Sequence, residues 1–109
     1  MATVRVERDS QGCVVVAAGD IDMNVADQLE AALEEASGDL PSVIVDLTDA
    51  TMLDSRAIGI LLAWTGRLQR VDGGLAIAGA SPDVRRLFAT IGLEREFHFH
   101  ATRDEARRG

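Results

Sequence analysis

Hydrophobic positions along the chain change between the spacing of strands and the spacing of helices. Val4 and Val6 alternate with charged residues, turn residues follow over 9–12, and an apolar run then occupies 13–18. This pattern predicts an N-terminal hairpin, which makes the sheet mixed. The β-branched run over 42–47 predicts a strand buried on both faces. Two shorter strands are predicted over 75–78 and 97–99.

Four segments have helical spacing of apolar residues together with helix start and stop signals. Asn24 is the predicted N-cap of the first helix, and Gly38 ends it. The second helix is predicted over Ser55–Val71, after a loop over 48–54, and Gly73-Gly74 follows it. The third begins at Ser81-Pro82-Asp83, with apolar residues at Val84, Leu87, Phe88 and Ile91, and ends at Gly92. The fourth begins at Thr102, which has capping-box spacing to Glu105.

The order of predicted elements is β-β-α-β-α-β-α-β-α. Strands that alternate with helices are typical of α/β proteins, in which crossover connections make the strands parallel. We therefore expect one domain over residues 1–109, with a mixed, mostly parallel sheet of about five strands and helices that cover it.

Composition excludes several classes of function. The net charge of −7 disfavours direct nucleic acid binding, which relies on basic residues. No apolar run approaches the roughly 20 residues of a membrane span, so we expect a cytoplasmic protein with no membrane insertion. Neither a phosphate-binding glycine loop nor a nucleophile elbow is present, and His98-x-His100 has no third ligand spaced nearby. We expect no cofactor, no metal and no enzymatic activity.

The predicted helix over Ser55–Val71 has two different faces. At 100° per residue, one stripe gathers the large apolar side chains and would pack on the sheet: Ala57, Ile60, Leu61, Trp64, Leu68 and Val71. The opposite face is small and smooth, and it consists of Gly59, Leu62, Ala63 and Gly66. Either another element of the domain covers this face, or a partner protein docks on it. We prefer the partner.

Ser55 is the predicted N-cap of this helix, where its hydroxyl would accept a free backbone N–H. A phosphate on Ser55 would add about −1.5 to −2 charge at the positive end of the helix dipole, which tolerates it. It would stand beside Asp54, and near Asp20 and Asp22 if the turn that they belong to lies at the same sheet edge.

Three segments in order resemble one bacterial family, the anti-sigma-factor antagonists of the STAS (sulphate transporter and anti-sigma antagonist) domains. Gly19-Asp-Ile-Asp22 is similar to the family's Gly-Glu-Leu-Asp turn, and Val45-Asp-Leu47 to its central strand. Asp54-Ser-Arg-Ala-Ile-Gly-Ile-Leu61 resembles its Asp-Ser-Ser-Gly-Leu-Gly helix start. The resemblance covers nearly the whole chain and implies a STAS fold.

The resemblance also implies a partner-switching phosphoprotein that regulates transcription. The unphosphorylated form would bind an anti-sigma factor that is also a GHKL-type serine kinase, and this would release a sigma factor. Phosphorylation of Ser55 would end binding, and a serine phosphatase would restore it. Asp54 and Asp22 match acidic neighbours of the family's serine.

Arg56 and Ala57 depart from the family's pattern of small residues and Gly. Arg56 could pair with a phosphate, and the Cβ of Ala57 could change how closely a kinase approaches. The alternative is a STAS scaffolding or accessory subunit, in a signalling assembly or a lipid-transport complex, without a phospho-switch.

Overall fold

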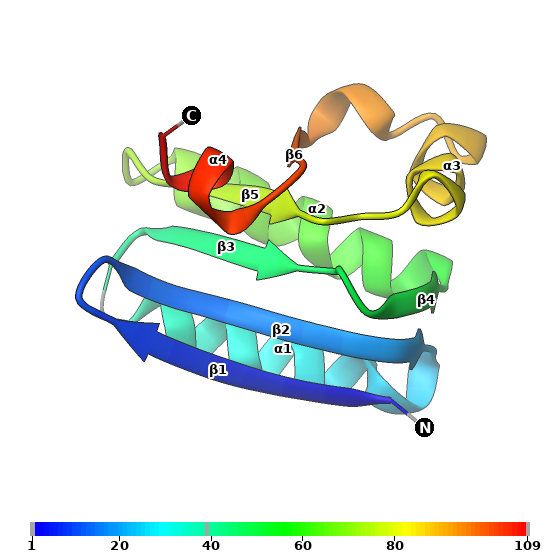
Figure 1. The fold of residues 1–109 in the computed structure, drawn as a ribbon, viewed down its shortest axis with the longest axis horizontal. Helices are drawn as coiled ribbons and strands as arrows, with labels where there is room; N and C mark the ends of the chain where they lie inside the picture. Colours follow the sequence, from blue (N-terminus) through cyan, green and yellow to red (C-terminus); the bar gives the residue numbers. More distant parts are fainter. Residues whose placement is uncertain (1, 39, 109) are drawn as a thin grey trace.

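The computed structural model describes residues 2–38 and 40–108 (Figure 1). Its elements follow one another along the chain as strands, helices and one short 3-10 segment. They are β1 (Thr3–Asp9), β2 (Gly12–Ile21), α1 (Met23–Ser37), β3 (Ser42–Asp46), β4 (Ala50–Leu53), α2 (Ser55–Gln69), β5 (Gly74–Ala78), α3 (Pro82–Thr90), η1 (Glu94–Glu96), β6 (His98–His100) and α4 (Arg103–Arg108).

The strands form a sheet in the order β1-β2-β3-β5-β6, and β4 pairs with the far end of β2 outside this path. Among the described strands only β1 and β2 pair antiparallel, and the pairs β2–β3, β2–β4, β3–β5 and β5–β6 are parallel. The prediction of a mixed, mostly parallel sheet in an α/β domain is therefore confirmed.

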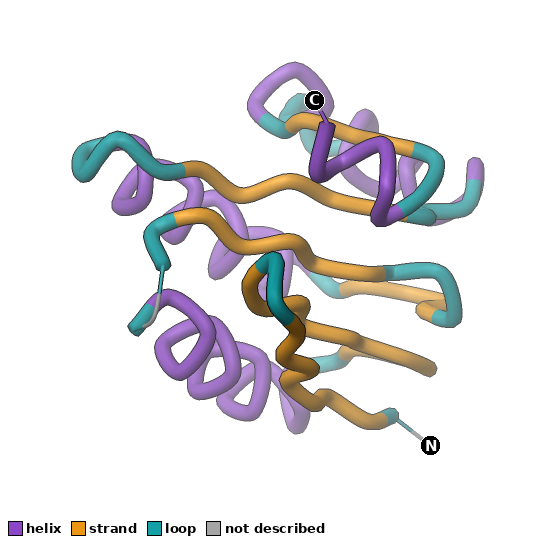
Figure 2. The backbone as a smooth tube through the Cα atoms, turned by 60° about the vertical axis from the view of Figure 1, so that its left-hand side comes forward, coloured by secondary structure: helices purple, strands orange, loops and turns teal. Residues whose placement is uncertain are grey.

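The two faces of the sheet are covered unequally. Helices α1 and α2 lie along one face, and the short α4 lies on the other (Figures 1 and 2). Side chains along a strand alternate between the faces, so Val43 and Val45 enter the main core, whereas Ile44 and Asp46 belong to the α4 face. The face that carries α4 is thus partly open.

Strand β4 was predicted as part of a loop. It exists because residues 50–53 pair in parallel with the end of β2, with Leu53 opposite Ile21. The same pairing extends β2 through Ile21, a segment that the sequence predicted to be a turn. Each strand end is held by the other, so neither could be recognised from its own residues.

Three predicted helix positions were wrong. Asp22 caps α1 in place of Asn24, and its carboxylate accepts the Asn24 N–H at 2.9 Å. Helix α2 ends at Gln69 because Asp72 adopts a positive φ of 60°, which leaves Val71 59% exposed outside the core. Ile91 follows the end of α3 and is 44% exposed. The left-handed backbone at Asp72 thus ends α2 before Val71.

The core between the sheet and its helices is mostly aliphatic and closed at one side by an aromatic cluster. Phe88 of α3 is fully buried and meets the rings of Phe97 and Phe99 edge-on, at 4.9 and 5.2 Å between centroids. The thiol of Cys13 is buried in the same core. Among the described residues, no helix has the length and apolar character needed to cross a membrane.

Candidate functional site

The pairing of β2 with β4 brings the starts of α1 and α2 to one edge of the sheet. Ile21 and Leu53 are partners in this pairing, and each is followed at once by the aspartate that begins a helix, Asp22 or Asp54. The Asp54 N–H donates to the Ile21 carbonyl at 3.0 Å, which ties the second helix start to the first. Two segments that lie 32 residues apart in sequence are thereby placed together.

Asp54, not Ser55, is the N-cap of α2. Asp54 has extended backbone angles, and its carboxylate accepts the Ala57 N–H at 2.9 Å, while its carbonyl accepts the Ile58 N–H at 3.1 Å. Ser55 is consequently the first helical residue, and its side chain is exposed. Because the cap is already provided by Asp54, the Ser55 hydroxyl is not needed to satisfy the helix end.

Acidic side chains gather around this edge of the sheet. The carboxylates of Asp22 and Asp54 cap the two helices, and Asp20 accepts a hydrogen bond from the Thr51 hydroxyl of β4. The predicted turn does lie at the same sheet edge as Ser55, although it is strand rather than turn. Added negative charge on Ser55 would therefore lie at the positive end of the α2 dipole, next to the capping carboxylate of Asp54.

Arg56 and Ala57, the two residues that depart from the family motif, have different surroundings in the structure. The Arg56 guanidinium pairs with Asp27 of α1 at 2.9 Å, and so links the two helices beside Ser55. Both side chains are largely exposed, so the pair contributes at most about 1 kcal/mol. Ala57 is fully buried in the core, so its Cβ points away from the surface that a partner could reach.

Helix α2 turns one broad face to the core and leaves the opposite face open. The buried positions are Ala57, Ile58, Leu61, Trp64, Thr65 and Leu68. Gly59 and Ala63 are exposed, whereas Gly66 and Leu62 are half-buried, and Leu62 packs partly against the core. Leu62 therefore lies at the edge of the smooth face rather than at its centre, and a substitution there would also disturb packing.

The smooth face, defined as Gly59, Ala63 and Gly66 with Leu62 at its edge, has no cover from the described part of the chain. A Cβ built on Gly59 or Gly66 would meet no atom of the described residues within 4 Å. Of the two explanations for this face, cover by another element of the domain is excluded for the two glycines. The bare helix backbone is accessible there.

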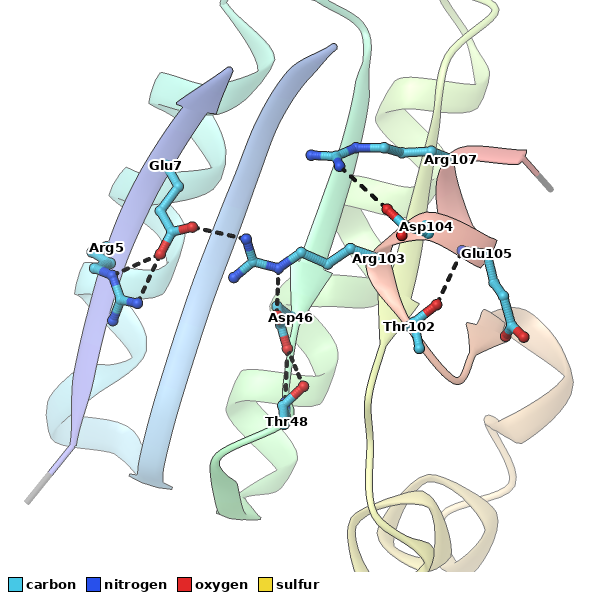
Figure 3. A network of polar contacts seen from close by, with 9 residues as sticks. All are labelled: Arg5, Glu7, Asp46, Thr48, Thr102, Arg103, Asp104, Glu105 and Arg107. Carbon is cyan, nitrogen blue, oxygen red and sulfur yellow. Dashed lines mark hydrogen bonds and ion pairs between the residues drawn. The ribbon is translucent and has the colours of Figure 1, made fainter. Parts of the chain in front are cut away.

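A second polar cluster, which the sequence did not predict, lies on the α4 face of the sheet (Figure 3). Arg103 donates from Nε to Asp46 Oδ2 at 2.6 Å and from Nη1 to Glu7 Oε1 at 2.8 Å. Asp46 is only 7% exposed, and its other oxygen accepts the Thr48 hydroxyl and N–H at 2.6 and 2.9 Å. Arg5 completes the chain of contacts by pairing with Glu7 at 2.7 Å.

These contacts shift the pKa values of the three ionised groups. Burial raises the pKa of Asp46, but hydrogen bonds from Thr48 and Arg103 outweigh burial, so this pKa lies below its ordinary value. Hydrogen bonds from Arg103 and Arg5 likewise lower the pKa of Glu7, and those from Glu7 and Asp46 raise the pKa of Arg103. The cluster is a structural tether for α4, and the one signal in the sequence was an aspartate at the end of a buried strand.

The histidines lie away from Ser55. His98 and His100 pair with Ala76 and Ala78 of β5, which places both on the α4 face, opposite to α2. Within the described residues neither histidine is hydrogen-bonded to the Ser55 hydroxyl, so no nucleophile and base are assembled. No group of three His, Cys, Asp or Glu side chains in the described ranges could hold a metal ion.

Comparison with known proteins identifies the family. A family model described as Mlab, STAS domain, matches residues 4–100. The chain belongs to the STAS domain family. This STAS domain is 31% identical to an anti-sigma-B factor antagonist of Listeria monocytogenes, over 80% of this chain and 77% of the relative. The resemblance carried by the segments around Gly19, Val45 and Ser55 is thus confirmed, and the chain belongs with the anti-sigma factor antagonists.

Solved STAS structures agree with this assignment. An anti-sigma factor antagonist from Mycobacterium paratuberculosis superimposes with a TM-score of 0.85 at 30% identity, covering 100% of this chain and 96% of that one. The anti-sigma factor antagonist SpoIIAA in its unphosphorylated form has a TM-score of 0.76 at 24% identity, covering 95% and 92% of the two chains. The latter likeness shows a common fold.

Proposed function

We propose that this STAS domain is a partner-switching antagonist whose unphosphorylated form binds an anti-sigma factor and thereby releases a sigma factor. The observation that supports it best is the position of Ser55, an exposed first residue of α2 at the end of a helix face that nothing in the described chain covers. The Listeria relative is an anti-sigma-B factor antagonist by name, and SpoIIAA has been solved in phosphorylated and unphosphorylated forms.

The docking surface in this proposal is the smooth face of α2 with Ser55 at one end. Gly59 and Gly66 let a partner approach the helix backbone closely, and Ala63 adds only a methyl group between them. Close approach allows good packing without a deep pocket, which suits a helix or loop of a partner protein. The anti-sigma factor would provide that segment.

Phosphorylation of Ser55 would switch this binding off by electrostatics and desolvation. A dianion at the edge of a docking face must lose water when the partner binds, and beside carboxylates such as Asp54 it makes that edge more negative toward the partner. The free domain tolerates the phosphate because the start of α2 has the positive end of the helix dipole. A penalty of about 3 kcal/mol on the complex alone would weaken binding about 100-fold.

The partners follow from the same proposal. The anti-sigma factor would itself be a serine kinase of the GHKL type, and a separate serine phosphatase would regenerate the binding form. The domain would act by protein contact and not by binding nucleic acid, consistent with its net charge of −7. It would operate in the cytoplasm of a bacterium, where sigma factors act.

The test combines phosphorylation with binding. The domain is incubated with ATP and the cognate kinase, phosphate is located by mass spectrometry, and the dissociation constant is measured by calorimetry before and after. We expect phosphate on Ser55 alone and a loss of affinity of about 100-fold.

Ser55→Ala should bind the partner and resist phosphorylation, and Ser42→Ala, at an exposed serine outside the α2 face, is the matched control. Equal binding by both forms would refute the switch. Phosphate at another residue, or none, would instead favour the scaffolding or accessory role.

A further inference from the structure

Strand β1 forms one edge of the sheet along its whole length (Figure 1). Among the described strands it pairs only with β2, and its seven residues, 3–9, are in regular antiparallel register with residues 12–18. In such a pair, alternate residues direct their N–H and C=O groups away from the neighbouring strand. The outer side of β1 therefore carries a row of backbone donors and acceptors that a further strand could bind.

Proteins usually protect such an edge, and β1 has few of the usual devices. The opposite edge strand, β6, has three residues and is followed closely by α4. By contrast, β1 has seven residues, no proline and no shift in its register with β2. Charged side chains are the remaining protection, and β1 does carry them. Their effect on a second strand depends on which residues stand opposite each other.

A second copy of the chain can pair with β1 in few antiparallel registers. A twofold axis perpendicular to the sheet keeps both α1 helices on one face, so residues opposite each other must point to the same face and have numbers that add to an even sum. With Val6 opposite Val6 of the second copy, all seven residues of β1 are paired. Registers centred on residue 5 or 7 pair residues 3–7 or 5–9 only.

The charges of β1 favour the same register. Centring on Val6 places Arg5 opposite Glu7 of the second copy, and this happens twice across the axis. Registers centred on residue 5 or 7 instead oppose two arginines or two glutamates, which is destabilising. On the other face of the sheet, the two half-buried Val6 side chains meet at the axis. Of these three registers, the longest is thus the one without like charges opposite each other.

The ion pairs within one chain are compatible with this arrangement. Glu7 Oε2 accepts two hydrogen bonds from Arg5, at 2.7 and 3.0 Å, and Oε1 accepts one from Arg103 at 2.8 Å. A carboxylate has about four acceptor sites and a guanidinium five donors, so a second pair across the axis need not displace the first. The Arg5 and Glu7 side chains are 57% and 38% exposed. Two arginines and two glutamates would alternate around the axis.

Helix α1 leaves room for the second copy. It packs on β1 and β2, so two such helices on one face of a joined sheet would be two strand spacings apart, about 9.6 Å. Packed helices are about 8–10 Å apart. Glu35 pairs with Arg8 of β1 at 3.0 Å, and so identifies the side of α1 toward the edge. Gln28 and Ala31 are on the same side at helical spacing, and both are exposed and uncharged.

We propose that β1 pairs with β1 of a second copy, antiparallel and centred on Val6, and that this joins two domains into a dimer with one continuous sheet. Backbone hydrogen bonds, the two Arg5–Glu7 pairs and the contact between the Val6 side chains would hold it together. One strand pair is small beside the interfaces of permanent dimers, so the dimer forms and dissociates with concentration. The smooth face of α2 and Ser55 are not part of this contact, so the dimer does not depend on the partner switch.

Sedimentation velocity from about 20 µM to about 1 mM measures the association, and amide shifts of the ¹⁵N-labelled protein over the same range locate it. We expect a dimer at the high concentrations, with shift changes along β1 and the edge side of α1. No shift change is expected at β6 or on the smooth face of α2.

Two charge variants test the register. Arg5→Glu should weaken association at least tenfold, because pairs of like charge replace both ion pairs across the axis. Glu7→Arg should weaken it similarly by opposing arginines. Arg95→Glu, at an exposed arginine of η1, makes the same charge change as Arg5→Glu and should dimerise normally.

A mixture of the two variants gives the sharpest result. In a dimer of one Arg5→Glu chain with one Glu7→Arg chain, both cross-strand pairs again join opposite charges, so the mixture should dimerise about as well as the unchanged protein. Glu7→Arg also loses its bond from Arg103, so thermal unfolding checks its fold. Arg5→Glu leaves that bond in place and tests the register even if Glu7→Arg fails to fold.

A protein that stays monomeric at about 1 mM would overturn the proposal. A dimer that Arg5→Glu leaves unchanged would also overturn it, as would two folded variants whose mixture does not associate. Concentration-dependent shifts confined to β6 or to α2 would place the contact on another surface, with the same consequence.

Discussion

Replacing the two open glycines of α2 by alanine should stabilise the free domain. In a helix interior Ala is favoured over Gly by about 1 kcal/mol, and a Cβ at Gly59 or Gly66 meets nothing within 4 Å among the described atoms. The two sites are two helical turns apart, about 10 Å, so their effects should add. The double variant should gain about 2 kcal/mol, or about 8 °C in Tm for a domain of this size.

Chemical and thermal unfolding of the four combinations of variants would measure this gain. Gly73→Ala is the matched control with the opposite expectation, because its Cβ would lie 1.8 Å from the Pro41 carbonyl oxygen and the chain would have to move. A fall in Tm for Gly59→Ala or Gly66→Ala would show that the helix face is not open and regular at that glycine.

The same variants separate stability from docking. If a partner packs on the bare backbone of the smooth face, each added methyl group should weaken the complex while the free domain becomes more stable. Gly66→Glu should weaken the complex further through a charge on the docking face. Unchanged affinity in Gly66→Glu would mean that the partner binds elsewhere, whatever the stability data show.

Three further predictions concern the tether of α4, the end of α2 and the link between α1 and α2. The pKa of Asp46 in the folded domain lies below its ordinary value of 3.8. Its contribution to stability is therefore present above that pH and is lost as the pH falls through the folded pKa. In Asp46→Asn the free energy of unfolding should depend less on pH below about pH 4. Leu68→Ala should cost about 2–5 kcal/mol, whereas Val71→Ala should change the free energy of unfolding by less than about 0.5 kcal/mol, because Leu68 is 4% exposed and Val71 59%. Arg56→Gln should cost at most about 1 kcal/mol, less in high salt, since its ion pair is exposed. Urea unfolding at the stated pH and salt would check all three.

The features that the sequence predicted correctly are those with a local physical cause. Helical spacing of apolar residues identified four positions of the core face of α2, because the period of a helix places them on one side: Ala57, Leu61, Trp64 and Leu68. It missed Ile58 and Thr65, which are also buried. Ser81-Pro82-Asp83 began a helix as expected, and the Ser81 hydroxyl accepts the Val84 N–H at 3.2 Å. Ser55 was singled out, together with Asp54, through a short contiguous motif, and its role as the phosphorylated residue stays a prediction.

The features that the sequence missed depend on segments far apart in the chain. Asp54 and Ser55 are both good capping residues, and the choice between them is made where Asp54 is held by the Ile21 carbonyl. The smooth face could be inferred from helical periodicity, but its exposure depended on where the other elements pack. Strand β4 exists only through its pairing with β2.

The sequence by itself thus determined the order of the elements apart from β4 and η1, most of the core face of α2 and the serine at the start of that helix. Tertiary structure alone decided that Asp46 meets Arg103, 57 residues away, and that β1 forms one edge of the sheet. Periodicity and capping act over one or two turns of chain and can be read locally. Ion pairs between elements and the edges of a sheet require the sheet order, which no local pattern encodes.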